Sequence, residues 1–224
     1  MNHPILLNIK RILKRLFIIF FFITFSSSVK SQSWELKENK NGVTIYTRSV
    51  AGSDIEEFKG ETTVKTNLGS LLNILEDFKN YPSWAYNCPY AERVKKVSAT
   101  EGYAYDVLEM PWPVSNRDLV MHYVITQNPL TKVVLVKLDA VNGYVPDKGY
   151  VRMTYLKGFY EFTPKPNGYV HITYQVHSDP GGYVPSYIVN AFVYDAPYYT
   201  LLNLKNKVES AGFIKTYRKE IQEL

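Results

Sequence analysis

The sequence predicts an α+β fold, in which an antiparallel sheet carries its helices on one side. Short segments of alternating apolar and polar residues are separated by turn sequences, one amphipathic helix interrupts them near residue 70, and a long apolar helix follows the last. Strands that outnumber helices and are joined by short turns are typical of this class. No repeat or linker divides the chain, so residues 32–224 are expected to form one domain.

The strand predictions depend on turns and on alternation. Asn41-Gly42 favours a tight hairpin turn, and Pro111-Trp112-Pro113 cannot lie in a central strand because two backbone donors are missing. Residues 169–177 alternate between apolar and polar side chains, which indicates one buried and one solvated face. Strands are expected over residues 34–40, 43–48, 55–66, 91–98, 103–110, 119–126, 133–141, 150–163 and 169–177.

Two helices are expected, over residues 68–79 and from Pro185 to a stop near Gly212, with the second helix turning polar past Leu204. Pro185 suits the first turn of a helix, and Pro197 should kink the second helix. The apolar arc of that helix is wider than a surface helix needs. It could cover either an ordinary core or a cavity, and the pattern leaves both open.

The N-terminal residues 1–31 are interpreted as a secretory signal peptide. A basic start precedes the apolar run Leu16–Phe25, and small residues follow before Gln32. Ten apolar residues are too few for a membrane-spanning helix, which needs about 20. We expect cleavage, export and a periplasmic location, with an uncleaved anchor as the alternative. No cysteine stands at the expected cleavage site after the run to accept a lipid.

The charge of the chain argues against a nucleic-acid partner. The formal net charge is +5, from 26 basic and 21 acidic residues. Residues 1–31 hold five basic residues and no acidic one, which leaves 21 against 21 in the remainder. A neutral domain lacks the electrostatic attraction that phosphate backbones require. Cys88 is the only cysteine, so no intramolecular disulfide is possible.

The sequence contains no pattern typical of a catalytic or metal site. His122, His171 and His177 lie outside metal-ligand spacings, and nucleophile-elbow, P-loop and dinucleotide motifs are absent. Asp106 and Glu109 are three residues apart on one predicted strand, hence on opposite faces, where they cannot act as a catalytic pair. We therefore expect no metal, no cofactor and no enzymatic activity.

Six short motifs in the correct order resemble the START family of steroidogenic-acute-regulatory-related lipid-transfer domains, over residues 33–210. They are Trp34-Glu35-Leu36 with Gly42-Val43-Thr44-Ile45-Tyr46, then Trp84, Met110-Pro111-Trp112-Pro113, Asn116-Arg117-Asp118, Tyr150-Val151-Arg152, and Asp179 to Asn190 with Pro197 beyond.

The resemblance implies a helix-grip fold, in which a curved antiparallel sheet wraps a long C-terminal helix around a hydrophobic tunnel. Tyr187, Ile188, Ala191 and Phe192 would roof this tunnel. The loop Gly181-Gly182-Tyr183 would be its gate. Sterol-binding members often carry a charged residue where this chain has Tyr123, which leaves the cargo open.

Strand parity and the resemblance together give a set of expected ligand contacts. For Arg117 and Arg152, anchoring a turn is the alternative to touching the ligand. The expected contacts are Trp84, Tyr103, Tyr105, Trp112, Arg117, Tyr123, Arg152, Tyr155, Tyr174, Tyr187, Ile188, Ala191 and Phe192.

Three functions remain open at this point. The first is a monomeric carrier that binds and transfers one lipid or other apolar small molecule, with transient membrane contact. The second is an enzyme resembling the polyketide cyclases and aromatases of the same architecture, which would need a buried histidine or acid with a shifted pKa. The third is a domain with a filled core and no cavity.

Overall fold

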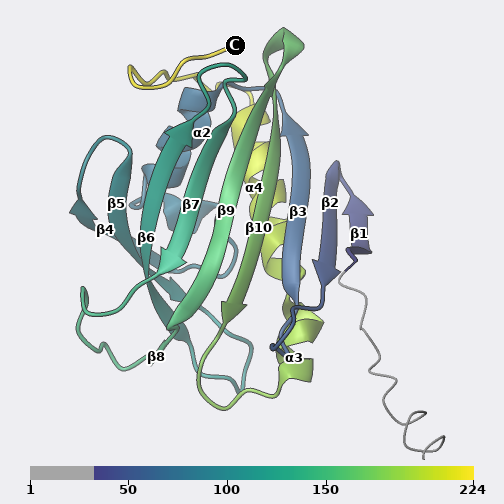
Figure 1. Ribbon diagram of the computed structural model, residues 1–224, viewed down its shortest axis with the longest axis vertical. Coiled ribbons are helices and arrows are strands. Elements are labelled where there is room, and N and C mark those ends of the chain that lie inside the picture. The colour runs from purple at the N-terminus through teal and green to yellow at the C-terminus, as the bar shows by residue number, and fades with distance from the viewer. Residues whose placement is uncertain (1–32) are drawn as a thin grey trace, which may run out of the picture. The chain divides into compact units, whose positions relative to one another are not determined.

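In the part of the chain that the structure describes, ten strands form one sheet. The computed structural model describes residues 33–224, without the side chain of Phe192. The strand order is β1-β2-β3-β10-β9-β7-β6-β5-β4 with antiparallel neighbours, and β8 lies parallel to β6 (Figure 1). The strands are β1 (Glu35–Lys40), β2 (Val43–Arg48), β3 (Glu57–Val64), β4 (Tyr90–Lys96), β5 (Glu101–Leu108), β6 (Arg117–Gln127), β7 (Val134–Ala140), β8 (Val151–Arg152), β9 (Tyr155–Lys165) and β10 (Tyr169–Asp179).

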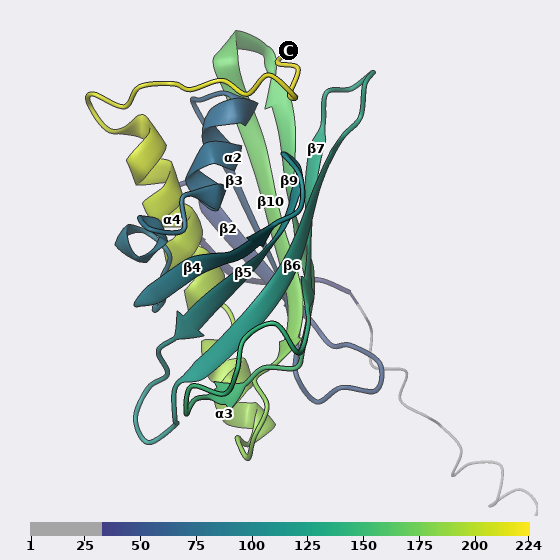
Figure 2. The same cartoon turned by 90° about the vertical axis from the view of Figure 1, so that its left-hand side faces the viewer.

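The helices lie on one side of the curved sheet. They are α2 (Leu68–Glu76), α3 (Ser186–Phe192) and α4 (Asp195–Glu209), and Figure 2 shows α2 and α4 facing the same surface of the sheet. Leu71 and Leu72 of α2 and Leu201 and Leu204 of α4 are fully buried in the core between these layers. The predicted α+β class and the helix-grip arrangement are confirmed.

The hairpin at Asn41-Gly42 forms as its sequence predicts. Both residues have positive φ, at 53° and 73°, which is the requirement of a type I′ turn. Lys40 and Val43 therefore pair directly across the turn and set the register of β1 against β2.

The C-terminal helix differs from its prediction, because it is two helices rather than one kinked helix. α3 ends at Phe192 and α4 begins at Asp195, so the break precedes Pro197. A proline inside a helix lacks a donor, and its ring clashes with the carbonyl four residues earlier, which here belongs to Val193. The interruption at Val193 and Tyr194 removes this conflict and leaves Pro197 in the first turn of α4, where proline is tolerated.

The predicted strand over residues 150–163 is also divided in two. Val151 and Arg152 pair in parallel with Arg117 and Asp118 of β6. From Tyr155 onward the chain pairs instead with β10, and β7 joins it from Lys157. The chain changes partner between these points, so the backbone ladder cannot be continuous.

The segment after α4 runs back across α2, which the sequence did not indicate (Figure 2). Glu223 accepts hydrogen bonds from the backbone N–H groups of Leu68 and Gly69, at 2.9 Å each, and so caps the N-terminus of α2. Thr216 accepts a bond from Asn67 and donates one to Ser70. The end of the chain thereby holds a helix from its first third.

The predicted signal peptide, residues 1–31, lies outside the described residues. Among residues 33–224, no helix combines the length and the apolar character that crossing a bilayer requires.

Candidate functional site

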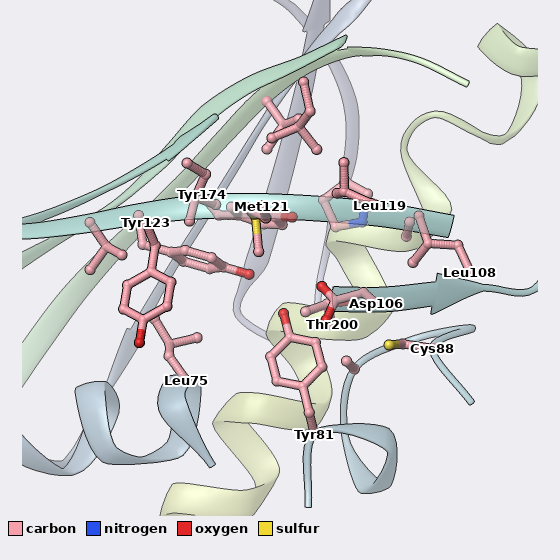
Figure 3. Close-up of a pocket in the computed structure, with 18 of the residues that line it drawn as sticks. Leu75, Tyr81, Cys88, Asp106, Leu108, Leu119, Met121, Tyr123, Tyr174 and Thr200 are labelled. Carbon is pink, nitrogen blue, oxygen red and sulfur yellow. The ribbon is translucent and has the colours of Figure 1, made fainter. Parts of the chain in front are cut away.

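A cavity lies between the sheet and the helices α2 and α4. Its volume, measured as the space that the centres of water molecules can occupy, is about 200 Å³. One water molecule needs about 10–15 Å³ by this measure. The space is therefore larger than a site for isolated waters, and the described core is not completely filled. Its lining includes Phe58, Leu72, Leu75, Glu76, Phe78, Tyr81, Cys88, Asp106, Leu108, Leu119, Met121, Tyr123, Tyr160, Tyr174, Pro197 and Thr200 (Figure 3).

Much of this lining comes from β6 and β5, whose side chains point alternately to the two faces of the sheet. Leu119, Met121 and Tyr123 occupy successive odd positions of β6 and face the cavity. On β5 the even positions Asp106 and Leu108 face it. Most of these side chains are apolar or aromatic, so the cavity is suited to a hydrocarbon surface.

Asp106 is the exception within this apolar wall. Its side chain is buried, and its Oδ1 atom has no hydrogen-bond partner among the described residues. Burial raises the pKa of this carboxyl to about 7, because a charged carboxylate is poorly solvated there. A buried polar atom without a partner is costly, so this position requires an explanation.

Three tyrosines of the lining lie next to one another, and two of them, Tyr81 and Tyr174, are close to Asp106. Tyr160 and Tyr174 stack face to face, with ring centroids 4.0 Å apart and planes only 1° from parallel. Tyr160 Oη also has no hydrogen-bond partner among residues 33–224. The pKa values of Tyr81 and Tyr174 are raised by burial and further by the negative charge of Asp106, which places both phenols near this carboxyl.

A second carboxyl, Glu76, lies at the boundary of the cavity but is fully partnered. Tyr123 donates to Glu76 Oε1 at 2.7 Å, Arg93 donates to the same oxygen at 3.0 Å, and Arg218 of the C-terminal segment binds Oε2. Burial acts to raise the pKa of Glu76, but the bonds from Tyr123 and Arg218 outweigh it and lower the pKa. The hydroxyl of Tyr123 is therefore already hydrogen-bonded within the protein.

Of the expected ligand contacts, Tyr123 and Tyr174 line the cavity. The predicted placement of Tyr103, Tyr105 and Tyr155 is corrected, since none of them faces it. Tyr103 stacks on His122 and Tyr144, whereas Tyr155 packs edge-on against His177. Tyr105 is fully buried on the opposite face of β5, beneath the chain around Val145. Both faces of β5 are covered, so burial did not identify the inner face.

The two arginines lie outside the cavity and hold loops. Arg117 is buried and donates to the backbone carbonyls of Pro180 and Gly181, at 3.2 and 3.0 Å. Arg152 forms an ion pair with Asp118 at 2.6 Å, and Asp118 also accepts from Tyr105. These contacts place both arginines as anchors of turns, the alternative that the sequence left open.

The predicted roof is corrected for the described side chains of α3, because Tyr187, Ile188 and Ala191 do not line the cavity. Tyr187 and Ala191 are exposed, Ile188 is half-buried, and the side chain of Phe192 is outside the description. From the C-terminal helices, the lining comes instead from Ala196, Pro197 and Thr200 of α4. The helix breaks before Pro197, and Figure 2 shows α3 at the lower end of α4.

The remaining expected contacts lie around the cavity without lining it. Trp84 is buried and packs edge-on against Tyr81, at 4.7 Å between ring centroids. Trp112 is 93% exposed in the loop after β5, and Tyr183 is fully exposed. Gly181 and Gly182 both have φ of 66°, so the predicted gate loop has a backbone that favours glycine.

Sequence reasoning missed Asp106, Tyr81, Tyr160 and Thr200 as lining residues. The position of Asp106 could have been noticed in the sequence. It lies between Tyr105 and Val107 in a mostly apolar segment, where an aspartate is either buried or at a bulge. No cluster of three potential metal ligands occurs among residues 33–224.

Comparison with known proteins identifies the family. The model of the START domain matches residues 27–196. The chain belongs to the START family. A relative with 35% identity over 180 residues, covering 80% of this chain and 88% of its own, is the uncharacterized protein PA1579 of Pseudomonas aeruginosa.

Solved structures agree with this membership. The STAR-related lipid transfer protein of Xanthomonas axonopodis is 34% identical, with a TM-score of 0.74 over 79% of this START chain and 99% of the other. Human StAR-related lipid transfer protein 5 has a TM-score of 0.66 over 89% of this chain and 96% of its own. At 17% identity it shows the shared fold alone.

Proposed function

We propose that this START protein binds one molecule of a lipid or sterol-like compound in the cavity and carries it through water. The observation that carries the proposal is the cavity itself, enclosed between sheet and helices and lined mainly by hydrocarbon and aromatic side chains. Family membership and the likeness to a bacterial STAR-related lipid transfer protein support it.

Binding would be driven by desolvation. Removal of apolar surface from water gains about 25 cal/mol per Å², so burial of one acyl chain contributes several kcal/mol. Entry and release would need motion of α3 and α4 away from the sheet, with the break at Val193 and the Gly181-Gly182 loop as hinges. We propose that a membrane surface receives the cargo, and that the carrier is exported to the periplasm after signal cleavage and works as a monomer.

The test is native mass spectrometry on mature protein from its own cell envelope, with extraction of whatever it holds. We expect one extra mass per chain in the lipid range. Met121→Trp places a bulky ring in the cavity and should abolish the extra mass. Thr126→Trp, on the exposed face of the same strand, should retain it and serves as the matched control. A bare protein that also fails to bind fluorescent lipids would contradict the proposal.

One observation favours the enzymatic alternative. Asp106 is a buried acid with a pKa of about 7 in the cavity, which is the feature that proton transfer near neutral pH would need. The described lining contains no histidine that could act with it. The two functions differ in the fate of the cargo, since a carrier returns its molecule chemically unchanged and a cyclase does not. Mass and structure of the extracted molecule before and after incubation decide between them.

A further inference from the structure

We propose that Asp106 binds a hydrogen-bond donor at the buried end of the cargo, an alcohol or a protonated amine, and that the cavity rejects cargo whose buried end is a carboxylate or phosphate. The proposal rests on the proposed carrier function and deepens it, because it assigns the polar chemistry of the ligand. It begins from the contrast between Asp106 and the other buried charged residues of the described chain.

Those other residues have partners within the protein. Glu57 accepts from Arg48 and Gln175, Asp118 pairs with Arg152, and Arg117 donates to backbone carbonyls. Asp106 differs, since its Oδ1 atom has no partner although the residue lines an open space. An acceptor left unpaired at this depth costs free energy unless something in the cavity satisfies it. The group that can satisfy an acceptor is a donor.

The charges of the lining exclude an anion at this end. Glu76 and Asp106 are the charged residues among the described lining, and both are acidic. The nearby cations, Arg93 and Arg218, are already bound to Glu76. A buried carboxylate or phosphate would thus meet two carboxyls without a free basic partner, which disfavours binding by charge repulsion and desolvation.

The tyrosines beside Asp106 complete the donor site. Tyr160 Oη is the other atom of the cavity lining that makes no hydrogen bond within the described residues; it lies next to the phenols of Tyr81 and Tyr174, and its ring is fixed by stacking on Tyr174. A phenol can donate or accept, so it can bind the lone pair of an alcohol or a second proton of an ammonium group. The aromatic faces of Tyr81 and Tyr174 would also tolerate a positive charge. An ether or ester oxygen would satisfy Tyr160 but leave Asp106 Oδ1 unpaired.

The experiment uses four probes with the same twelve-carbon chain: dodecan-1-ol, dodecylamine, laurate and dodecyl methyl ether. Dissociation constants are measured at pH 7.5 by displacement of a fluorescent lipid from the mature protein. We expect the alcohol, the amine or both to bind roughly tenfold tighter than laurate and the ether, the effect of one hydrogen bond to a charged group.

Two substitutions at Asp106 distinguish an alcohol donor from an ammonium donor. Asp106→Leu removes the acceptor and should abolish the preference for any donor while leaving the ether unchanged. Asp106→Asn keeps an acceptor without the charge, so a preference for the alcohol should survive it and a preference for the amine should not. Asp54→Asn alters an exposed aspartate and is the matched control. Circular dichroism checks that each variant is folded.

The proposal is overturned if laurate or the ether binds the native protein as tightly as both donors, or if Asp106→Leu leaves the preference intact. In these cases the carrier function survives, because the probes still bind. If no probe binds, including the ether, both the carrier function and this proposal fail.

Discussion

Asp106 shows how one residue can conflict with its surroundings. The folded protein holds this carboxyl at a pKa of about 7, against 3.8 for the same group in water. Between these two values the folded chain binds more protons than the unfolded chain. The free energy of unfolding must therefore fall as the pH rises through this window and level off above it.

We predict that Asp106→Asn removes this pH dependence and stabilises the protein at pH 8. One pKa unit corresponds to about 1.4 kcal/mol, so the shift of about three units sets an upper limit of about 4 kcal/mol. Urea unfolding at pH 4, 6 and 8 measures the effect. A native profile that is flat over this range, or an Asp106→Asn protein with the native slope, would contradict the prediction.

At the residue scale, the sequence indicated that aromatic and apolar side chains line the cavity, but it did not always indicate which of them face it. Tyr174 lies on the cavity side of β10, as the alternation of that strand predicts, whereas Tyr123 lies on β6, whose first four residues are all buried, and was singled out through the family resemblance. On β5 the odd position Tyr105 and the even position Asp106 are both buried, and the alternation therefore contains no signal of direction. The residues that cover Tyr105 come from a loop about 40 positions later, which local patterns cannot indicate.

Among the elements, α2 depends most clearly on a distant contact. Its N-terminal N–H groups are capped by the carboxylate of Glu223 rather than by a neighbouring residue, since Asn67 makes no side-chain capping bond to the helix. A carboxylate at this end also interacts favourably with the helix dipole. The wall of the cavity formed by Leu72 and Leu75 is therefore stabilised from the far end of the sequence.

We predict that Glu223→Ala lowers the free energy of unfolding by about 1 kcal/mol, the typical cost of losing a cap. Hydrogen exchange at Leu68 and Gly69 should accelerate while exchange in β10 stays unchanged. Glu109→Ala, which removes an exposed carboxyl in the loop after β5, is the control and should have no measurable effect. Equal exchange rates at Leu68 in the native and Glu223→Ala proteins would show that the cap contributes nothing.

Element boundaries were predictable where a local rule fixes them. Asn41-Gly42 set the first hairpin, and the helix predicted over 68–79 ends before Pro82, although it stops at Glu76, three residues earlier than predicted. Local rules located the boundaries less well where a helix is interrupted or a strand changes its pairing partner. Pro197 indicated an interruption, but its effect lies at Val193, the position of the carbonyl that its ring would meet. The division between β8 and β9 depends on pairing with strands far away in sequence.

For the whole molecule, two carboxyls at the cavity act on stability in opposite directions. The pKa of Glu76 is lowered by its partners Tyr123 and Arg218, so its contribution is complete above its ordinary value and is lost as the pH falls through the lowered value. The contribution of Asp106 changes the other way, with stability lost as the pH rises from about 4 to about 7.

We predict a maximum in the free energy of unfolding in the acidic range, at about pH 4, because the loss at Asp106 begins at about this pH and the contribution of Glu76 is lost below it. Denaturation at intervals of half a pH unit from 3 to 9 gives the profile. Glu76→Gln should weaken the fall on the acid side, and Asp106→Asn should remove the fall on the neutral side. A native maximum at pH 8 or above would show that neither carboxyl governs the profile.

The docking of Glu223 on α2 also has a consequence for synthesis of the chain. Leu68 and its capping residue are 155 positions apart. At the usual elongation rates of 5–20 residues per second, roughly 8 to 31 s pass between the appearance of the helix and that of its cap. During this time the apolar face of α2 lacks both its cap and its partner α4. A nascent chain is therefore most dependent on chaperones in this interval, and ribosome profiling of chaperone contacts should show them persisting until the last residues emerge.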